Sequence, residues 1–144
     1  MRFFALMVAM VLVAVPVVAQ SAQPDFASEA LRYTHAQEAA MAPDAGPDQV
    51  DALLAFYADD YVYHHPQFGA MVTGRDAQRR GATAQLGLTS GASIEVRGVQ
   101  VNGNLVSLAT VERFTVRADG KTVERPRITV LTFRDGKIVQ RVDI

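Results

Sequence analysis

The stretch Tyr57-Ala58-Asp59-Asp60-Tyr61-Val62-Tyr63-His64-His65-Pro66, followed by Gly69 and Thr73-Gly74-Arg75-Asp76, reads as a short extended segment between two helices. Pro66 biases the residue before it, His65, toward an extended conformation. Side chains alternate along a strand, so Tyr61, Tyr63 and His65 share one face and their neighbours share the other. One histidine can therefore enter a cavity while His64 points away, and the adjacent pair is a poor metal chelate.

Helical patterns precede this segment. Residues 25–41 lack Gly and Pro, and one residue in every three or four recurs on a single stripe: Phe26, Ala30, Tyr33, Gln37 and Met41. If Tyr33 faces the interior, His35 lies on nearly the opposite side and faces water.

A second, short helix follows the break at residues 42–47. Asp48 is its predicted N-cap, and its buried stripe is predicted to be Val50, Leu53, Leu54 and Tyr57. A third helix is predicted from Gly74 to about Leu86, although Gly81 weakens it.

From residue 92 onward the pattern becomes that of a β-meander. Asn102-Gly103, Asp119-Gly120 and Asp135-Gly136 are tight-turn dipeptides between alternating, β-branched segments. They predict antiparallel strands over about 92–101, 104–117, 121–134 and 137–144. The apolar parity changes at Gly98, which predicts a β-bulge there.

These elements predict an α+β domain with three N-terminal helices on a strongly curved antiparallel sheet. The helices cover one face of the sheet and leave a conical cavity, which is a usual place for a ligand.

The 57–76 stretch resembles the nuclear transport factor 2-like superfamily, a cystatin-like fold, and in particular its SnoaL-like and ketosteroid isomerase-like branches. In those proteins a helix ending in Tyr-Ala-Asp-Asp runs into a short strand, a Pro, a loop and a helix that begins with Gly-Arg. The resemblance covers residues 25–144 and implies a SnoaL-like domain that works without cofactor or metal. The motif is more specific for the fold than for any particular reaction.

The resemblance also implies roles for individual residues. His65 stands where ketosteroid isomerases carry the Asp that shuttles a proton, and an imidazole can accept and return a proton near neutral pH. Tyr33 on the first helix could donate to an enolate, but a Tyr on an apolar stripe is more often a core residue, which is the preferred interpretation. Thr129 falls where the isomerases carry an acidic donor, and Thr is a weaker one. Asp143 resembles the acidic residue near the end of many SnoaL-like chains.

A substrate pocket is predicted around His65, with Tyr61, Tyr63, Phe68, Thr129 and Leu131 as its walls. By parity with Leu108 and Phe114, Glu112 would also point inward.

The register of the last strand decides what Asp143 does. A two-residue Asp135-Gly136 turn pairs Phe133 with Ile138 and turns Asp143 away from Thr129. A three-residue loop instead sets Asp143 opposite Arg127 on the cavity side. The first register buries more apolar surface and is the preferred prediction.

The first residues predict export. Arg2 precedes thirteen apolar residues and a small-residue run, which is typical of a signal peptide over residues 1–19 cut after Ala19; residues 20–24 form a linker. The alternative is a membrane anchor, for which the apolar run is short. The expected location is the periplasm or the outside of the cell, with no stable membrane insertion after cleavage.

Composition narrows the functions further. With 14 basic residues, 15 acidic residues and no Cys, a nucleic-acid partner, a disulfide scaffold and a thiolate site are not expected. Three functions stay open: an isomerase, cyclase or lyase with His65 as general base, a non-catalytic domain that binds a small apolar molecule, or a homodimerisation domain. The dimer would use the outer sheet face around Ile128 and Val130.

Overall fold

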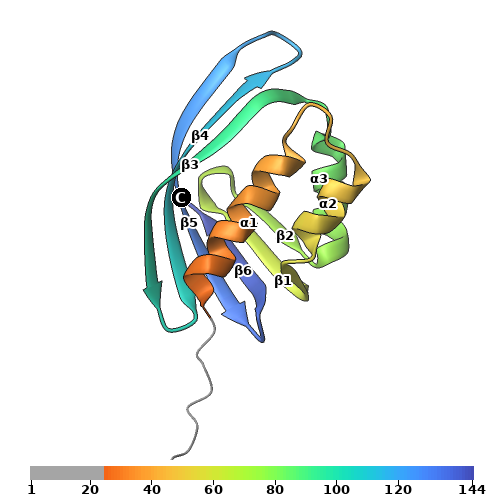
Figure 1. Cartoon of the computed structure of the whole chain (residues 1–144). Helices are drawn as coiled ribbons and strands as arrows, with labels where there is room; N and C mark the ends of the chain where they lie inside the picture. The colour runs from red at the N-terminus through yellow and green to blue at the C-terminus, as the bar shows by residue number, and fades with distance from the viewer. Residues whose placement is uncertain (1–24) are drawn as a thin grey trace, which may run out of the picture.

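Three helices and six strands make up the part of the chain that the computed structural model describes, residues 25–144 (Figure 1). The predicted signal peptide and linker lie outside these residues. The elements are α1 (Phe26–Ala40), α2 (Pro47–Leu54), β1 (Tyr57–His65), β2 (Ala70–Thr73), α3 (Arg75–Gln85), β3 (Thr89–Asn102), β4 (Leu105–Val116), β5 (Thr122–Arg134) and β6 (Lys137–Asp143). The three predicted helices and the four-stranded meander are confirmed.

The helices form where their periodicity and caps place them. The Asp25 carboxylate caps α1 by accepting from the Ser28 N–H at 3.1 Å, and the α1 stripe buries Tyr33 while His35 is exposed, as predicted. The predicted N-cap of α2 is wrong. The cap is Gly46, whose N–H donates to the Gln49 side chain at 2.9 Å.

Pro47 explains the earlier start of α2. Its ring fixes φ near the helical value, and the N–H that it lacks has no partner in a first turn, so it suits the first helical position. The helix ends at Leu54, so Tyr57 is the first residue of β1 rather than part of the helical stripe. Tyr57 is nevertheless buried.

The sheet is mixed, in the order β2-β1-β6-β5-β4-β3. The extended segment of the sequence becomes two strands, because a turn of 3-10 helix at Pro66–Phe68 reverses the chain and β2 pairs antiparallel with β1. β1 lies parallel to β6, and the other neighbouring strands are antiparallel. The N-terminal strand pair thereby extends the C-terminal meander, and both halves of the sequence contribute to the concave face.

Register shifts interrupt the ladders of β1, β3 and β6, and two of them bear on the predictions made from the sequence. The predicted bulge at Gly98 is confirmed by a register shift between Val96 and Gly98. A second shift lies in β6: Phe133 pairs with Ile138, but Thr132 pairs with Gln140, which leaves Val139 as an extra residue.

The β6 bulge corrects the prediction for Asp143. The two-residue turn pairs Phe133 with Ile138 as preferred, yet Asp143 lies opposite Thr129 and is fully buried. It neither turns away from Thr129 nor lies opposite Arg127. The turn alone fixes only the first pairs, and the extra residue reverses the side-chain parity beyond it.

Helix α1 crosses the concave face of the sheet (Figure 1), and the core lies between them. The buried apolar residues are Ala30, Tyr33, Val50, Leu53, Leu54, Tyr57, Tyr61, Val106, Leu108, Leu131, Phe133 and Ile138. On the outer face Ile128 is 41% exposed, so a dimer through this face stays a prediction. No helix within residues 25–144 has the length and apolarity to cross a membrane.

We expect Gly81→Ala to raise the free energy of unfolding by about 0.5–1 kcal/mol, because Ala is a better helix former than Gly in the interior of α3. A Cβ at this position meets no atom within 4 Å. Gly136→Ala is the opposite case: its φ is +72°, so a side chain there should cost about 1–2 kcal/mol. Chemical denaturation measures both, and a destabilised Gly81→Ala variant would contradict the placement of α3.

Candidate functional site

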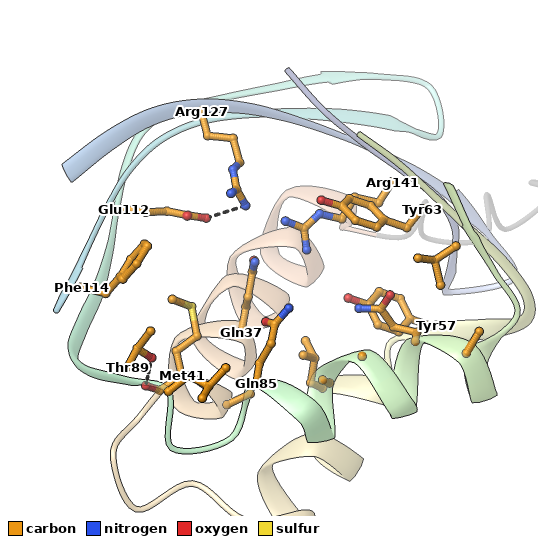
Figure 2. Close-up of a pocket in the computed structure, with 18 of the residues that line it drawn as sticks. Gln37, Met41, Tyr57, Tyr63, Gln85, Thr89, Glu112, Phe114, Arg127 and Arg141 are labelled. Carbon is orange, nitrogen blue, oxygen red and sulfur yellow. Dashed lines mark hydrogen bonds and ion pairs between the residues drawn. The ribbon is translucent and has the colours of Figure 1, made fainter. Parts of the chain in front are cut away.

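A cavity of about 410 Å³ lies between α1, α3 and the concave face of the sheet (Figure 2). Its lining is mixed: apolar side chains such as Met41, Leu53 and Phe114 form walls, and polar side chains gather where β4, β5 and β6 meet. The charged residues of the lining are Glu112, Arg125, Arg127 and Arg141.

Asp143 lies directly behind this polar end and holds a set of donors. Arg141 makes a bidentate pair with it, Nε to Oδ1 at 2.8 Å and Nη2 to Oδ2 at 2.6 Å. The Thr129 hydroxyl donates to Oδ1 at 2.8 Å, and the Tyr63 hydroxyl donates to Oδ2 at 3.1 Å. Arg127 approaches Oδ2 at 3.2 Å. Strands β1, β5 and β6 thus meet at one buried carboxylate.

These partners keep the carboxylate ionised. Burial alone would raise the pKa of Asp143, but the charge and hydrogen bonds of Arg141, the charge of Arg127 and the Thr129 hydroxyl hold it below its usual value. Burial and the negative charge of Asp143 raise the pKa of Tyr63 to about 12, so this phenol is protonated and donates at neutral pH. Asp143 is therefore a weak proton acceptor and a strong anchor.

Glu112 is the second carboxylate at the polar end and faces inward, as its parity in β4 predicts. It is buried and pairs with two arginines of β5, Arg125 Nε at 2.9 Å and Arg127 Nη1 at 2.8 Å. Because burial lowers the pKa of Arg127 and both carboxylates oppose that effect, the guanidinium keeps its charge.

Tyr33 connects this charged group to α1. Arg141 Nη1 donates to the Tyr33 hydroxyl at 2.5 Å, and the Tyr33 and Tyr57 hydroxyls are 3.0 Å apart. The Gln37 side-chain oxygen accepts from Arg141 Nη1 and Nη2, at 3.2 and 3.1 Å, in the amide orientation that satisfies both residues. Burial raises the pKa of Tyr33 well above its usual value. Tyr33 does not line the cavity, whereas Tyr57 does.

His65 lies at the end of β1, outside the lining of this cavity. It is 8% exposed, and its Nδ1 has no hydrogen-bond partner among residues 25–144. Its ring packs on Phe68, with centroids 4.4 Å apart, and edge-on to Tyr63. Phe68 is 72% exposed and forms no part of the cavity wall.

The residues that the sequence predicts around one pocket therefore lie in different parts of the structure. Tyr63 is the only one of the predicted wall residues within 25–144 that lines the cavity, while Tyr61 and Leu131 belong to the core and Thr129 binds Asp143. Tyr33 and Asp143 are joined through Arg141. Among residues 25–144, no three His, Asp or Glu side chains come together in a way that could hold a metal ion.

Sequence reasoning missed Arg141, which is the centre of the site. A usable signal existed: Arg141 is two residues before Asp143, so any register that turns one inward turns both. Arg125 and Arg127 likewise share parity with Thr129 and Leu131 in β5.

A curved sheet with helices enclosing a cavity on its concave face defines the nuclear transport factor 2-like class of α+β domains. Within that class the chain belongs to the SnoaL-like domain family, whose model matches residues 30–141. Comparison with curated proteins finds no match.

Solved structures share this fold. A protein from Catenulispora acidiphila with a ketosteroid isomerase-like fold, in complex with trimethylamine, is 20% identical with a TM-score of 0.64 over 78% of this chain and 83% of that one. An epoxide hydrolase from M. tuberculosis, of the LEH-like kind, is 19% identical with a TM-score of 0.64 over 81% of both chains. An NTF-2 like protein of unknown function from Burkholderia xenovorans is 25% identical, with a TM-score of 0.54 over 81% and 84%.

We expect Asp143→Asn to lower the free energy of unfolding by about 3–5 kcal/mol at pH 7, because it leaves the buried Arg141 charge without its partner. The folded-state pKa of Asp143 lies below the unfolded value of about 3.9. The stability that ionised Asp143 contributes is therefore fully present above the unfolded-state pKa and is lost as the pH falls through the folded-state pKa. The difference in free energy of unfolding between the variant and wild type should therefore narrow in acid.

Denaturant unfolding between pH 3 and pH 7 measures this effect. Asp60→Asn is the matched control, since it breaks an exposed ion pair in which Arg134 Nη2 donates to both Asp60 oxygens, and it should change stability little. Equal stability of Asp143→Asn and wild type at pH 7 would contradict the claim that the buried Arg141–Asp143 pair stabilises the fold.

Proposed function

We propose that this SnoaL-like domain binds a small, largely apolar molecule in the cavity between α1, α3 and the sheet. The observation that carries the proposal is the cavity itself, whose volume of about 410 Å³ lies in the usual range of small-molecule sites. Apolar walls with a few convergent polar groups at one end are the usual composition of such sites. The proposed ligand places its apolar body against Met41, Leu53 and Phe114.

The proposed setting is outside the cytoplasm, in the periplasm or secreted. The support is the sequence, in which Arg2, a run of apolar residues and a small-residue run up to Ala19 precede the domain.

A second candidate function is a cofactor-independent isomerase, cyclase or lyase that uses His65 as its general base. One observation favours it: the buried Nδ1 of His65 has no partner among residues 25–144, and an unpaired buried nitrogen is costly unless a ligand or water meets it. Against it stands the position of His65 outside the cavity lining. We therefore place binding first and catalysis second.

We expect Gly81→Leu to weaken ligand binding at least about tenfold, because Gly81 lines the cavity and a leucine side chain from α3 would occupy its space. The neutral apolar probe N-phenyl-1-naphthylamine reports binding by its fluorescence. Gly81→Ala is the matched control, which adds a single methyl group and should change the dissociation constant by less than about threefold. If wild type gives no saturable binding of such neutral probes, or if Gly81→Leu binds as well as wild type, the proposed cavity site is wrong.

His65→Ala separates the two candidate functions. Because His65 lies outside the cavity, binding alone predicts that its loss changes the probe's dissociation constant by less than about threefold. The catalytic candidate predicts that wild type accelerates exchange of the α-protons of an apolar ketone, 2-tetralone, in D₂O and that His65→Ala abolishes this exchange. Proton NMR follows the exchange, and circular dichroism checks that the variant is folded. Equal exchange rates in wild type and variant would exclude His65 as the base.

A further inference from the structure

Positive charge exceeds negative charge at the polar end of the cavity. Three guanidinium groups, those of Arg125, Arg127 and Arg141, face the two carboxylates of Glu112 and Asp143, which leaves a net charge of +1. Apart from Arg125, whose side chain is 42% exposed, these groups are largely buried, and charge there is screened less than at a surface. The lining therefore carries one positive charge more than its carboxylates balance, and the half-exposed Arg125 is the most solvent-screened of the three guanidinium groups.

The two carboxylates have little capacity left to bind a ligand. Both oxygens of Asp143 accept from Arg141, and Thr129 and Tyr63 add one donor each. Each oxygen of Glu112 contacts an arginine. A cationic or hydrogen-donating ligand would have to displace one of these partners.

Arg127 has spare capacity to donate. Its closest approaches are ion pairs of Nη1 with Glu112 at 2.8 Å and Asp143 at 3.2 Å, and it donates no well-aligned hydrogen bond to any residue within 25–144. A guanidinium carries five N–H donors. Its side chain is 9% exposed and lines the cavity.

The position of Arg127 suits a ligand oxygen. Figure 2 shows its guanidinium reaching from β5 into the space between Glu112 and Arg141, with Gln37 of α1 below it. Apolar side chains such as Phe114 and Met41 begin beside this polar group. A molecule with an apolar body and one anionic group would meet matching chemistry at both ends.

We propose that the cavity selects an apolar monocarboxylate, with Arg127 as the residue that binds the carboxylate group. This inference rests on the proposed small-molecule function and names its ligand class. A carboxylate brings the net charge of the polar end to neutral and takes the N–H donors that Glu112 and Asp143 leave free. Guanidinium matches carboxylate geometry with two parallel hydrogen bonds, which a neutral amide cannot reproduce.

The test compares two probes of the same size, 2-naphthoate and its neutral counterpart 2-naphthamide, by isothermal titration calorimetry at low ionic strength. We expect wild type to bind naphthoate at least about tenfold more tightly than naphthamide. Arg127→Gln should remove most of that preference while leaving naphthamide within about threefold, and Arg127→Lys should keep part of it because it retains the charge. Arg79→Gln is the matched control, since Arg79 pairs with Asp51 on the surface and does not line the cavity.

A second variant keeps the test decisive if Arg127→Gln fails to fold. Glu112→Gln removes a competing carboxylate and releases the Arg127 guanidinium, so it should tighten naphthoate binding and leave naphthamide unchanged. Equal affinities for the two probes would overturn the carboxylate inference and leave the cavity site standing. Binding of neither probe would overturn both proposals. A naphthoate preference that Arg127→Gln does not alter would place the anion elsewhere and overturn the role of Arg127.

Discussion

The Arg141–Asp143 pair is the constraint around which the concave side of this domain is organised. Removing either charge from water costs several kcal/mol, and the pair recovers that cost only with good geometry and further hydrogen bonds. Both conditions are met: the contact is bidentate, and Thr129, Tyr63, Tyr33 and Gln37 satisfy the remaining donors and acceptors. Because these partners come from α1, β1 and β5, the pair holds the helix and both halves of the sheet in one arrangement.

The bulge at Val139 makes that arrangement possible. Ile138 must face the core, and Arg141 must also face inward, yet the two residues are separated by an odd number of positions. A regular strand would place them on opposite faces, and the extra residue restores them to the same face. The bulge costs some ladder pairing in β6 and in return puts both charged residues opposite Leu131 and Thr129.

The sequence predicted the helices, the meander and the Gly98 bulge because each rests on a local pattern: periodicity, turn dipeptides or a parity change within apolar residues. The β6 bulge gives no such sign, since Ile138 and Val142 have the same parity on either side of it and no glycine marks the position. Arg141 and Asp143 lie beyond this bulge, so the sequence does not predict their orientation correctly either. The resemblance indicates Asp143, whereas Arg141 belongs to no motif, and an arginine is ordinarily a surface residue. Tyr61 and Leu131 face inward as their parity predicts, but they pack in the apolar core and do not line the cavity.

Thr129 binds Asp143 and does not carry the acidic side chain that the resemblance implies at its position. Where the resemblance implies an acidic donor for an enolate, the Thr129 hydroxyl instead donates a hydrogen bond to Asp143 Oδ1 at 2.8 Å. Asp143 in turn is held ionised by two arginines, so it resists taking up a proton near neutral pH. Asp143 and Arg141 behind the cavity are therefore fixed charges matched to each other, while Arg127 keeps N–H donors that no residue within 25–144 takes. Such an arrangement costs little reorganisation when an oxygen of a ligand enters, which suits the proposed binding of a charged group.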